Sequence, residues 1–289
     1  MIEVRAMSGS PFKISTIGGV RYGEIPQSAD GPTGHTFVLL HGLGNSLEFW
    51  SAVAPLLSIH SRVIAPDIPG FGQSSAPLGM ALSSYRDSLE SFARRIDGGP
   101  IRLVGHSMGG LLAMELATSL GEGVASLTLV DAHIFTAVSI VHAPYLGVIH
   151  PEIALNLALQ FIGGSVPIGR IGANAVAHDS TTRKLLLWPF AKDPGKLDRH
   201  LVSEALEHGG GFGALRTPFI ARGFDMEHLA SQLSCPTRLT WGVNDALLRQ
   251  QDLDKAYETM TLDWAIPIAD CGHWPMLEEP EQLSRLLLK

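Results

Sequence analysis

The chain has 289 residues, of which 45% are hydrophobic and 17% are charged, and this composition is typical of a protein with a large buried core. It carries 28 acidic and 21 basic residues, and no run of lysine and arginine is longer than a pair. This balance excludes a disordered chain and argues against nucleic acid or an anionic membrane as a partner. The apolar stretches of the sequence are too short to span a bilayer.

The first residues, MIEVRAMSGSPFK, lack the charged start and apolar stretch of a signal peptide. Two cysteines, Cys235 and Cys271, do not make a disulfide framework. We therefore expect a cytoplasmic protein by default, although an exported protein whose leader had been removed would have a similar sequence. The sequence leaves the oligomeric state open, and a homodimer is one option.

Strand patterns come first along the chain. Residues 12–25, FKISTIGGVRYGEI, predict an antiparallel hairpin with a Gly-Gly turn at the edge of a sheet. Apolar runs at 36–42, 62–70 and 101–107 each end at a glycine-bearing turn, and a fourth run follows at 125–132. Their length and branched side chains are typical of buried parallel strands.

Helical spacing of apolar residues separates these strands, at 47–57, 82–96 and 111–120. Strands that alternate with helices of this length indicate βαβ units. We therefore predict an α/β fold, a mostly parallel central sheet with helices on both faces.

The alternation stops between 134 and 222, where the sequence is rich in Ala, Leu, Ile and Gly. Residues 153–164 and 199–210 predict short helices that end at glycine pairs. Alternation resumes afterwards and ends in a terminal helix. We predict one α/β core, residues 1–133 and 223–289, with a helical unit inserted at 134–222.

A serine stands between two glycines in LVGHSMGG, residues 103–110. Ser107 with Gly105 and Gly109 matches G-x-S-x-G, and it follows a predicted strand and precedes a predicted helix, as that motif requires. The alternative is a tight turn in which serine is merely small and polar. Ser46 and Ser74 also follow a glycine two positions earlier, but they lack the second glycine. Ser107 is therefore the candidate nucleophile.

A serine hydroxyl needs a base, and the base needs an orienting group. His273, in CGHWPMLEEP after the last predicted strand, is the best-placed candidate base; the alternative is a surface-loop histidine. We choose Asp245, at the end of the next-to-last strand, as the acid. Asp131 is its rival, because it closes the preceding strand at the same edge. Asp67 also follows a strand, but its sequence context is typical of an aspartate that orders its own turn.

The negative charge of a tetrahedral intermediate needs backbone N–H donors. The glycine-rich HGLG, residues 41–44, could aim the N–H of Leu43 inward, with the N–H of Met108 as the second donor. A phosphate loop is excluded because G-x-G-x-x-G would need glycine at position 47 and no G-K-[ST] occurs. No H-E-x-x-H or paired-cysteine spacing exists either, so we predict no metal and no cofactor.

The segments HGLGNS, DIPGFGQS, GHSMGG, WGVND and CGHWPMLEEP, in this order and spacing, resemble the α/β-hydrolase fold family. The likeness is to single-domain members with a helical cap inserted after strand six. It is specific for residues 36–133 and 236–289 and vague across the insertion. The resemblance implies the roles given above for nucleophile, base, acid and oxyanion donors, in the chain order Ser, Asp, His. It also implies a substrate pocket between cap and core.

The resemblance narrows the reaction. Relatives that open epoxides or displace halide carry an aspartate at the position of Ser107, so those reactions are disfavoured. Relatives that hydrolyse carbon–carbon bonds usually have asparagine before the nucleophile and GPG in the oxyanion loop, where this chain has His106 and Leu43-Gly44-Asn45. Cofactor-free haloperoxidases share the triad with esterases. We predict a carboxylic ester hydrolase that forms an acyl-enzyme with a small, largely apolar substrate.

We expect Trp274, Trp188 and His106 to contact that small-molecule substrate, although an apolar cap also packs on a core. Arg170 or Arg183 could meet a substrate carboxylate, unless both are solvated at the surface. Three alternatives remain open: a carbon–carbon bond hydrolase, an acyltransferase or biosynthetic cyclase with the same triad, and a receptor that retains the triad for binding. No sequence feature favours the receptor.

Overall fold

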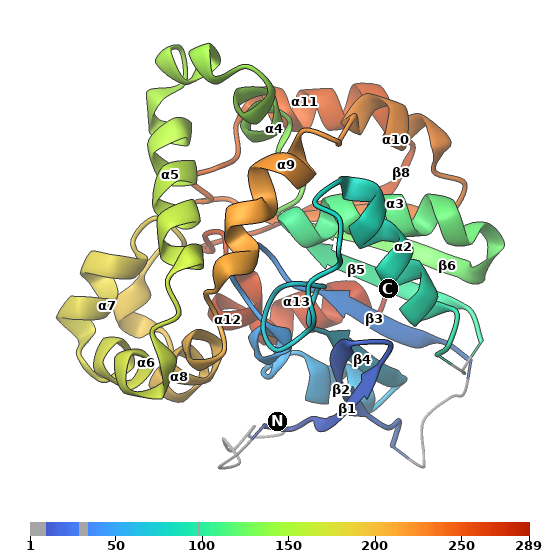
Figure 1. The fold of residues 1–289 in the computed structure, drawn as a ribbon, viewed down its shortest axis with the longest axis horizontal. Coiled ribbons are helices and arrows are strands. Elements are labelled where there is room, and N and C mark those ends of the chain that lie inside the picture. Colours follow the sequence, from blue (N-terminus) through green and yellow to red (C-terminus); the bar gives the residue numbers. More distant parts are fainter. Residues whose placement is uncertain (1–9, 29–33, 97–98) are drawn as a thin grey trace.

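The structure is a computed structural model that describes residues 10–28, 34–96 and 99–289; residues 1–9, 29–33 and 97–98 of the predicted core lie outside these ranges. One eight-stranded sheet, in the order β1-β2-β4-β3-β5-β6-β7-β8, organises the fold (Figure 1). The strands are β1 (Lys13–Ile17), β2 (Val20–Ile25), β3 (Thr36–Leu40), β4 (Arg62–Pro66), β5 (Ile101–His106), β6 (Val124–Val130), β7 (Thr237–Gly242) and β8 (Leu262–Ile268).

The hairpin predicted at the start of the sequence is present at the edge of the sheet. β1 pairs with β2 in antiparallel fashion, and β2 pairs with β4 in the same sense. Gly18 and Gly19 form the turn with φ angles of 58° and 84°, and a two-residue turn with both φ angles positive matches the twist of the strands it joins. All other neighbouring strands are parallel.

Helices cover both faces of the sheet, as predicted. α2 and α10 pack against α3 on one face, and α1 packs with α13 on the other. The helices of this part are α1 (Ala54–Ser58), α2 (Leu82–Ala93), α3 (Met108–Leu120), α10 (Met226–Gln232), α11 (Gln250–Thr259), α12 (Pro275–Glu278) and α13 (Pro280–Leu287), with 3-10 helices at Leu47–Trp50 and Gly121–Gly123.

The side chains of the central strand β3 contribute to two hydrophobic clusters, one on each face of the sheet. Val38 and Leu40 belong to the hydrophobic cluster on the α3 side, whereas Phe37 and Leu39 belong to the cluster on the α13 side. Successive side chains of a strand point to opposite faces, so an uninterrupted apolar run is buried on both. This explains why the strand reads as TFVLL rather than as an alternating pattern.

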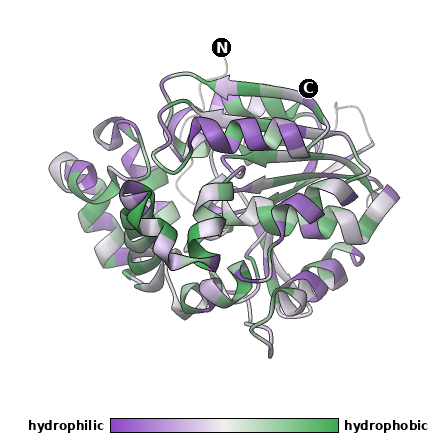
Figure 2. Cartoon of the chain, turned by 90° about the horizontal axis from the view of Figure 1, so that it is seen from above, coloured by the Kyte–Doolittle hydropathy of each residue, from purple (hydrophilic) through white to green (hydrophobic). Residues whose placement is uncertain are grey.

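The stretch from 134 to 222 contains helices and no strand, and every residue of it is described. Figure 1 shows α5, α6, α7 and α8 grouped to one side of the strands. Figure 2 shows hydrophobic stretches both on the strands and along these helices. The helices are α4 (Phe135–His142), α5 (Pro151–Ser165), α6 (Gly169–His178), α7 (Ser180–Leu187), α8 (Arg199–Glu207) and α9 (Thr217–Ala221), with 3-10 helices at Pro144–Val148, Pro194–Lys196 and Phe212–Arg216.

Both hydrophobic clusters extend from the sheet into these helices. Ile153 of α5 and Ile220 of α9 belong to the cluster around α3, and Leu187 and Val202 belong to the other one. Buried apolar contacts therefore hold the helical stretch on the rest of the molecule. Within the described residues, none of the helices is long and apolar enough to cross a membrane.

The carboxyl ends of the parallel strands meet at one edge of the sheet. Leu40 of β3 is paired with Gly105 of β5, and His106 of β5 is paired with Val130 of β6. The residues that follow these strands therefore lie side by side, although they are far apart in sequence. In sheets of this kind, ligands bind at the carboxyl ends of the strands.

Candidate active site

Ser107 occupies the turn between β5 and α3 with φ 52° and ψ −124°. This is a region that residues other than glycine rarely adopt, and holding one there costs on the order of 1–3 kcal/mol. The sequence pattern predicted that the following helix begins at 111, but α3 begins at Met108. The serine therefore stands directly at the positive end of a helix of 13 residues.

Three glycines make this turn sterically feasible. A Cβ added to Gly105 would lie 2.5 Å from the Cα of Gly110, and one added to Gly109 would overlap the carbonyl oxygen of His41. A Cβ on Gly110 would overlap the Cβ of Ala132. The two glycines of the motif thus allow the backbone of this turn to pass close to its neighbours. The need for the third was missed, because only the packing against the neighbouring strand reveals it.

His273 and Asp245 form a buried pair. The Nδ1 atom of His273 lies 2.6 Å from Oδ2 of Asp245, and the other carboxylate oxygen accepts a hydrogen bond from the N–H of Leu247 at 2.8 Å. Burial alone raises the pKa of Asp245, but the His273 ring and these hydrogen bonds outweigh it and hold the pKa below its ordinary value. Asp245 is therefore an ionised acceptor for the ring N–H of His273.

Asp131, the rival acid, lies beside this pair. One of its oxygens accepts a hydrogen bond from the N–H of Gly242 at 2.9 Å, and the other is buried without a donor among the described residues. Burial, and then the charge of Asp245, raise the pKa of Asp131 well above its ordinary value. Two adjacent buried carboxyl groups do not both ionise, so Asp131 is the protonated one.

These three side chains are the one cluster of metal-ligand type in the described part of the chain, with ligand atoms within 4.8 Å of one another. The 2.6 Å separation of Nδ1 and Oδ2 is that of a hydrogen bond. It leaves no room for a cation between the two atoms. The arrangement is that of an imidazole and its orienting acid.

Ser107 and His273 line the same cavity. No hydrogen bond joins the serine hydroxyl to the imidazole among the described residues, and catalytic hydrogen bonds are often long until a substrate is bound. The ring of His106, which precedes the serine, lies with its centroid 4.8 Å from that of His273. The fold therefore brings the candidate base next to the candidate nucleophile.

His106 has a second role that the sequence did not reveal. Its Nε2 lies 2.7 Å from the carbonyl oxygen of His273. Since a carbonyl only accepts, Nε2 carries the proton and Nδ1 is bare. Burial lowers the pKa of His106 well below its ordinary value, so the ring is neutral. His106 lines the cavity, as expected of a substrate contact. It also stabilises the loop of His273 through its hydrogen bond to the carbonyl of that residue.

The two expected oxyanion donors lie at this site. Leu43 lines the cavity, and no acceptor is found for its N–H among the described residues. Met108 is the first residue of α3, and N–H groups in a first turn have no intrahelical acceptor. A Cβ added to Gly42 would lie 3.4 Å from the Cβ of Ser107, so the glycine-rich loop runs directly against the serine.

Two buried polar residues hold that loop. His41 accepts a hydrogen bond from the N–H of Ile68 at 3.0 Å through Nε2, and it donates from Nδ1 to the carbonyl of Gly42 at 2.8 Å. Asp67 accepts from the N–H of Leu47 at 2.7 Å. Asp67 was expected to order its own turn; it also ties the loop after β3 to the loop after β4.

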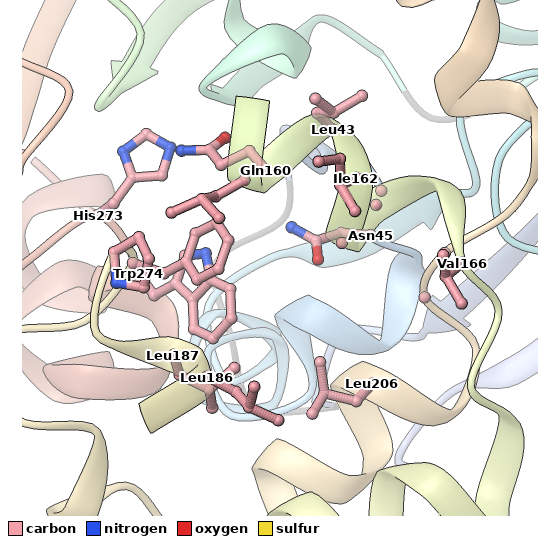
Figure 3. A pocket seen from close by; sticks show the side chains of 18 of the residues that line it. Leu43, Asn45, Gln160, Ile162, Val166, Leu186, Leu187, Leu206, His273 and Trp274 are labelled. Carbon is pink, nitrogen blue, oxygen red and sulfur yellow. The ribbon is translucent and has the colours of Figure 1, made fainter. Parts of the chain in front are cut away.

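The cavity has a volume of about 370 Å³ and contains no aspartate, glutamate, lysine or arginine in its lining. Figure 3 shows His273 and Gln160 at one end of it, with Val166 and Leu206 at the other. It is lined by Leu43, Gly44, Asn45, His106, Ser107, Leu159, Gln160, Ile162, Gly163, Gly164, Val166, Ile168, Val176, Leu185, Leu186, Leu187, Trp188, Pro189, Phe190, Leu206, Gly209, Gly210, His273 and Trp274.

Both tryptophans that the sequence singled out line the cavity. Trp274 is buried and stacks on Phe190 with a centroid separation of 4.8 Å and an interplanar angle of 9°. Trp188 is 54% exposed. Neither arginine reaches the cavity: Arg170 is exposed, and Arg183 is buried and donates to backbone carbonyl groups.

The polar lining residues Gln160 and Asn45 were not anticipated. Gln160 donates to the side-chain oxygen of Asn156 at 3.1 Å, and Asn156 donates to the carbonyl of Pro189 at 3.1 Å. In Figure 3 the Gln160 amide points toward His273. In the sequence Gln160 stands within an apolar helix pattern, and its role becomes apparent only from the packing of α5 over the site.

This fold and site agree with a match to a family profile described as the alpha/beta hydrolase family, which covers residues 37–286. The chain belongs to the alpha/beta hydrolase family.

Among curated proteins, the chain is 28% identical over 268 residues to a dihydrolipoyllysine-residue acetyltransferase component of the acetoin cleaving system of Pseudomonas putida. That match covers 89% of this chain and only 64% of the relative, which is the longer protein. The chain is 27% identical to a 2-hydroxy-6-oxo-6-(2'-aminophenyl)hexa-2,4-dienoic acid hydrolase of Metapseudomonas resinovorans, over 88% of this chain and 83% of the relative.

A third relative is a pimeloyl-acyl-carrier-protein methyl ester esterase of Sodalis glossinidius (strain morsitans), 28% identical over 86% of this chain and 91% of the relative. Among solved structures, a thioesterase domain from the curacin biosynthetic pathway superposes with a TM-score of 0.69 at 19% identity. It covers 96% of this chain and 99% of the domain, and at this identity the likeness concerns the fold alone.

Proposed function

We propose that the chain is a serine hydrolase that cleaves an uncharged carboxylic ester through an acyl-enzyme on Ser107. The observation that carries the proposal is the buried His273–Asp245 pair, 2.6 Å apart, whose histidine lines the same cavity as Ser107, a serine held in a positive-φ turn. A reactive hydroxyl needs this combination of base and orienting acid. The strain at Ser107 supports it, because the turn exposes the hydroxyl above the sheet edge.

The mechanism follows from the roles of these groups. Nε2 of His273 takes the proton of Ser107, whose oxygen attacks the ester carbonyl, while Asp245 holds the ring orientation and stabilises the imidazolium. The N–H groups of Leu43 and Met108 bind the oxyanion. His273 then gives the proton to the departing alcohol and activates the water that releases the acid.

The lining of the cavity favours an ester over the carbon–carbon alternative. The relative from Metapseudomonas resinovorans is named for a dienoic acid, which carries a carboxylate. This cavity offers no arginine or lysine to such a group, and a buried charge without a partner is costly. The similarity to a methyl ester esterase also supports an ester as the substrate.

We further propose that residues 134–222 form a cap on a core made of the rest of the chain. The cavity takes its floor from segments near Ser107 and His273 and its remaining walls from α5 to α8 and their connections. A substrate would therefore be enclosed between the two. Cavities between such layers commonly bind small molecules.

The test is hydrolysis of a small aryl ester by Ser107→Ala. We expect kcat to fall at least about 10³-fold, because no other group in the cavity can replace the nucleophile. Partition of the acyl group between water and added methanol, measured on the unmodified protein, separates hydrolysis from acyl transfer. Retention of most of the turnover by Ser107→Ala would remove the assignment.

A further inference from the structure

Six apolar side chains belong to the cavity lining and are nevertheless exposed to solvent. Single exposed apolar residues are ordinary, but a contiguous group at the border of a cavity marks a binding surface. We call this group the rim. It consists of Ile162 (62% exposed), Val166 (52%), Ile168 (38%), Leu185 (71%), Leu186 (51%) and Trp188 (54%).

The rim has two sides. Ile162 lies near the end of α5, and Val166 and Ile168 follow it in the connection to α6. The other three lie at the end of α7 and directly after it. In Figure 3, Val166 and Leu186 lie away from the end of the cavity that holds His273. The side chains of the cavity lining that are exposed to solvent are thus apolar and come from two elements, α5 and α7, and the residues that directly follow them.

The lining changes from buried to exposed without a polar boundary. Leu187 is 5% exposed and faces the cavity, and its neighbour Leu186 belongs to the rim. The polar side chains of the lining, those of Asn45, Gln160, Ser107 and the two histidines, are all buried. A ligand group that extends out of the buried part of the cavity therefore continues to contact apolar side chains.

We propose that the rim is a subsite for the outer part of a long, unbranched aliphatic chain of the substrate. The inference rests on the proposed function and names its substrate class: an uncharged ester with its carbonyl at Ser107 and a chain longer than the inner cavity. The chain is the occupant because the rim side chains are themselves part of the cavity lining. Each methylene that leaves water for this surface strengthens binding about fourfold.

The test uses two series of esters, one with acyl chains from two to about twelve carbons on one aryl alcohol, and one with acetate esters of alcohols of the same lengths. We expect kcat/KM to rise about fourfold per methylene in one of the series and to continue rising after the inner cavity is full. The series that rises identifies which side of the ester lies on the rim. A flat profile in both series would overturn the subsite.

A matched pair of variants tests the residues. Ile162 and Leu155 are exposed residues of α5, seven positions apart and hence on one side of the helix, but only Ile162 lines the cavity. The double variant Ile162→Ser/Leu186→Ser should lower the ratio of kcat/KM for the long-chain ester to kcat/KM for the acetate ester about tenfold. This is the effect expected when contacts equivalent to about one to two methylene groups are lost. Leu155→Ser should keep the ratio of the unmodified protein.

An equal ratio in the double variant and in Leu155→Ser would contradict the rim assignment. Fluorophosphonate labelling keeps this result apart from a failure of the proposed function. Labelling at Ser107 with flat chain-length profiles overturns the subsite alone. Absence of both labelling and turnover at every chain length overturns the proposed function, and the subsite with it.

Discussion

Asp131 and Asp245 are two buried carboxyl groups beside the imidazole of His273, and their different surroundings give them different charge states. Asp245 accepts from His273 and from a backbone N–H, and its pKa is held below the ordinary value. Asp131 has one oxygen without a donor among the described residues, a positive backbone φ of 48°, and a pKa raised by burial and by Asp245. As a neutral acid, Asp131 can donate its proton toward Asp245 and steady the carboxylate that orients His273.

The isosteric variants Asp245→Asn and Asp131→Asn separate the two roles. Asp245→Asn should lower kcat by about 10⁴, because an amide favours the wrong histidine tautomer. Asp131→Asn should lower it by less than about tenfold, since an amide N–H still donates where the acid O–H did. Steady-state kinetics on one aryl ester checks both. If Asp131→Asn causes the larger loss, Asp131 is the orienting acid.

The candidate oxyanion loop, residues 41–44, is hydrogen-bonded to the segment after α8, which is in turn hydrogen-bonded to the end of α5, and all of these groups are glycine backbone. The carbonyl of Gly44 accepts from the N–H of Gly210 at 2.7 Å, and the N–H of Gly211 donates to the carbonyl of Gly164 at 3.0 Å. Gly164 belongs to the last turn of α5, and Gly210 and Gly211 follow α8. Because Gly44 follows Leu43, the position of α5 affects the direction of the Leu43 N–H, the proposed oxyanion donor.

Gly164→Ala tests this coupling, with Gly163→Ala as its neighbour in the same helix. A Cβ at 164 would lie 3.1 Å from the Cα of Gly44, which must move, whereas a Cβ at 163 meets nothing within 4 Å. We expect Gly164→Ala to lower kcat for an acetate ester about tenfold, a part of the loss seen when an oxyanion donor is removed. Equal kcat values for the two variants would show that the junction does not position the loop.

The elements that the sequence revealed are those whose cause is local. The strand before Ser107 shows as an apolar run, its turn shows as two glycines, and the hairpin shows as a Gly-Gly pair. The early start of α3 was missed because its first turn contains Gly109 and Gly110, which are poor helix formers; close contacts with residues at the ends of neighbouring strands require them. Local pattern takes no account of such tertiary contacts.

Part of the candidate site was also predicted from the sequence. Ser107, Asp245 and His273 were identified from motifs and strand order, and the structure brings them to one sheet edge. The bond from His106 to the His273 carbonyl and the orientation of Gln160 had no sequence signal. The first joins residues 167 positions apart, and the second matters only because α5 packs over the site; periodicity within one segment reveals neither.

Several histidines of the whole molecule are buried in neutral form, and this sets a limit on its stability in acid. Burial lowers the pKa of His41 and of His106, and it lowers the pKa of His133 to about 4. His133 lies against Trp241 with a centroid separation of 5.5 Å, and its Nδ1 has no partner among the described residues. The unfolded chain would bind protons at these rings before the folded chain does.

The sign of the effect follows from this difference. His133 has its ordinary pKa of 6.5 when unfolded and about 4 when folded, so its stabilising contribution is complete above pH 6.5 and is lost as the pH falls toward 4. Urea unfolding should show the unmodified protein losing roughly 3 kcal/mol more than His133→Asn between pH 7 and pH 4. Comparison at each pH cancels the opposite effect of buried carboxyl groups such as Asp131. If the free energies of unfolding of the two proteins changed in parallel with pH, the prediction for His133 would be contradicted.

The central claim is that the oxygen of Ser107 bonds covalently to the acyl group. The most direct measurement is the mass of the protein after acid quenching of its reaction with an aryl ester, followed by peptide mapping. We predict one added acyl group, on the peptide that contains Ser107, and none in Ser107→Ala. Turnover that proceeds with no acyl group on that peptide, or with the group on another residue, would contradict the account.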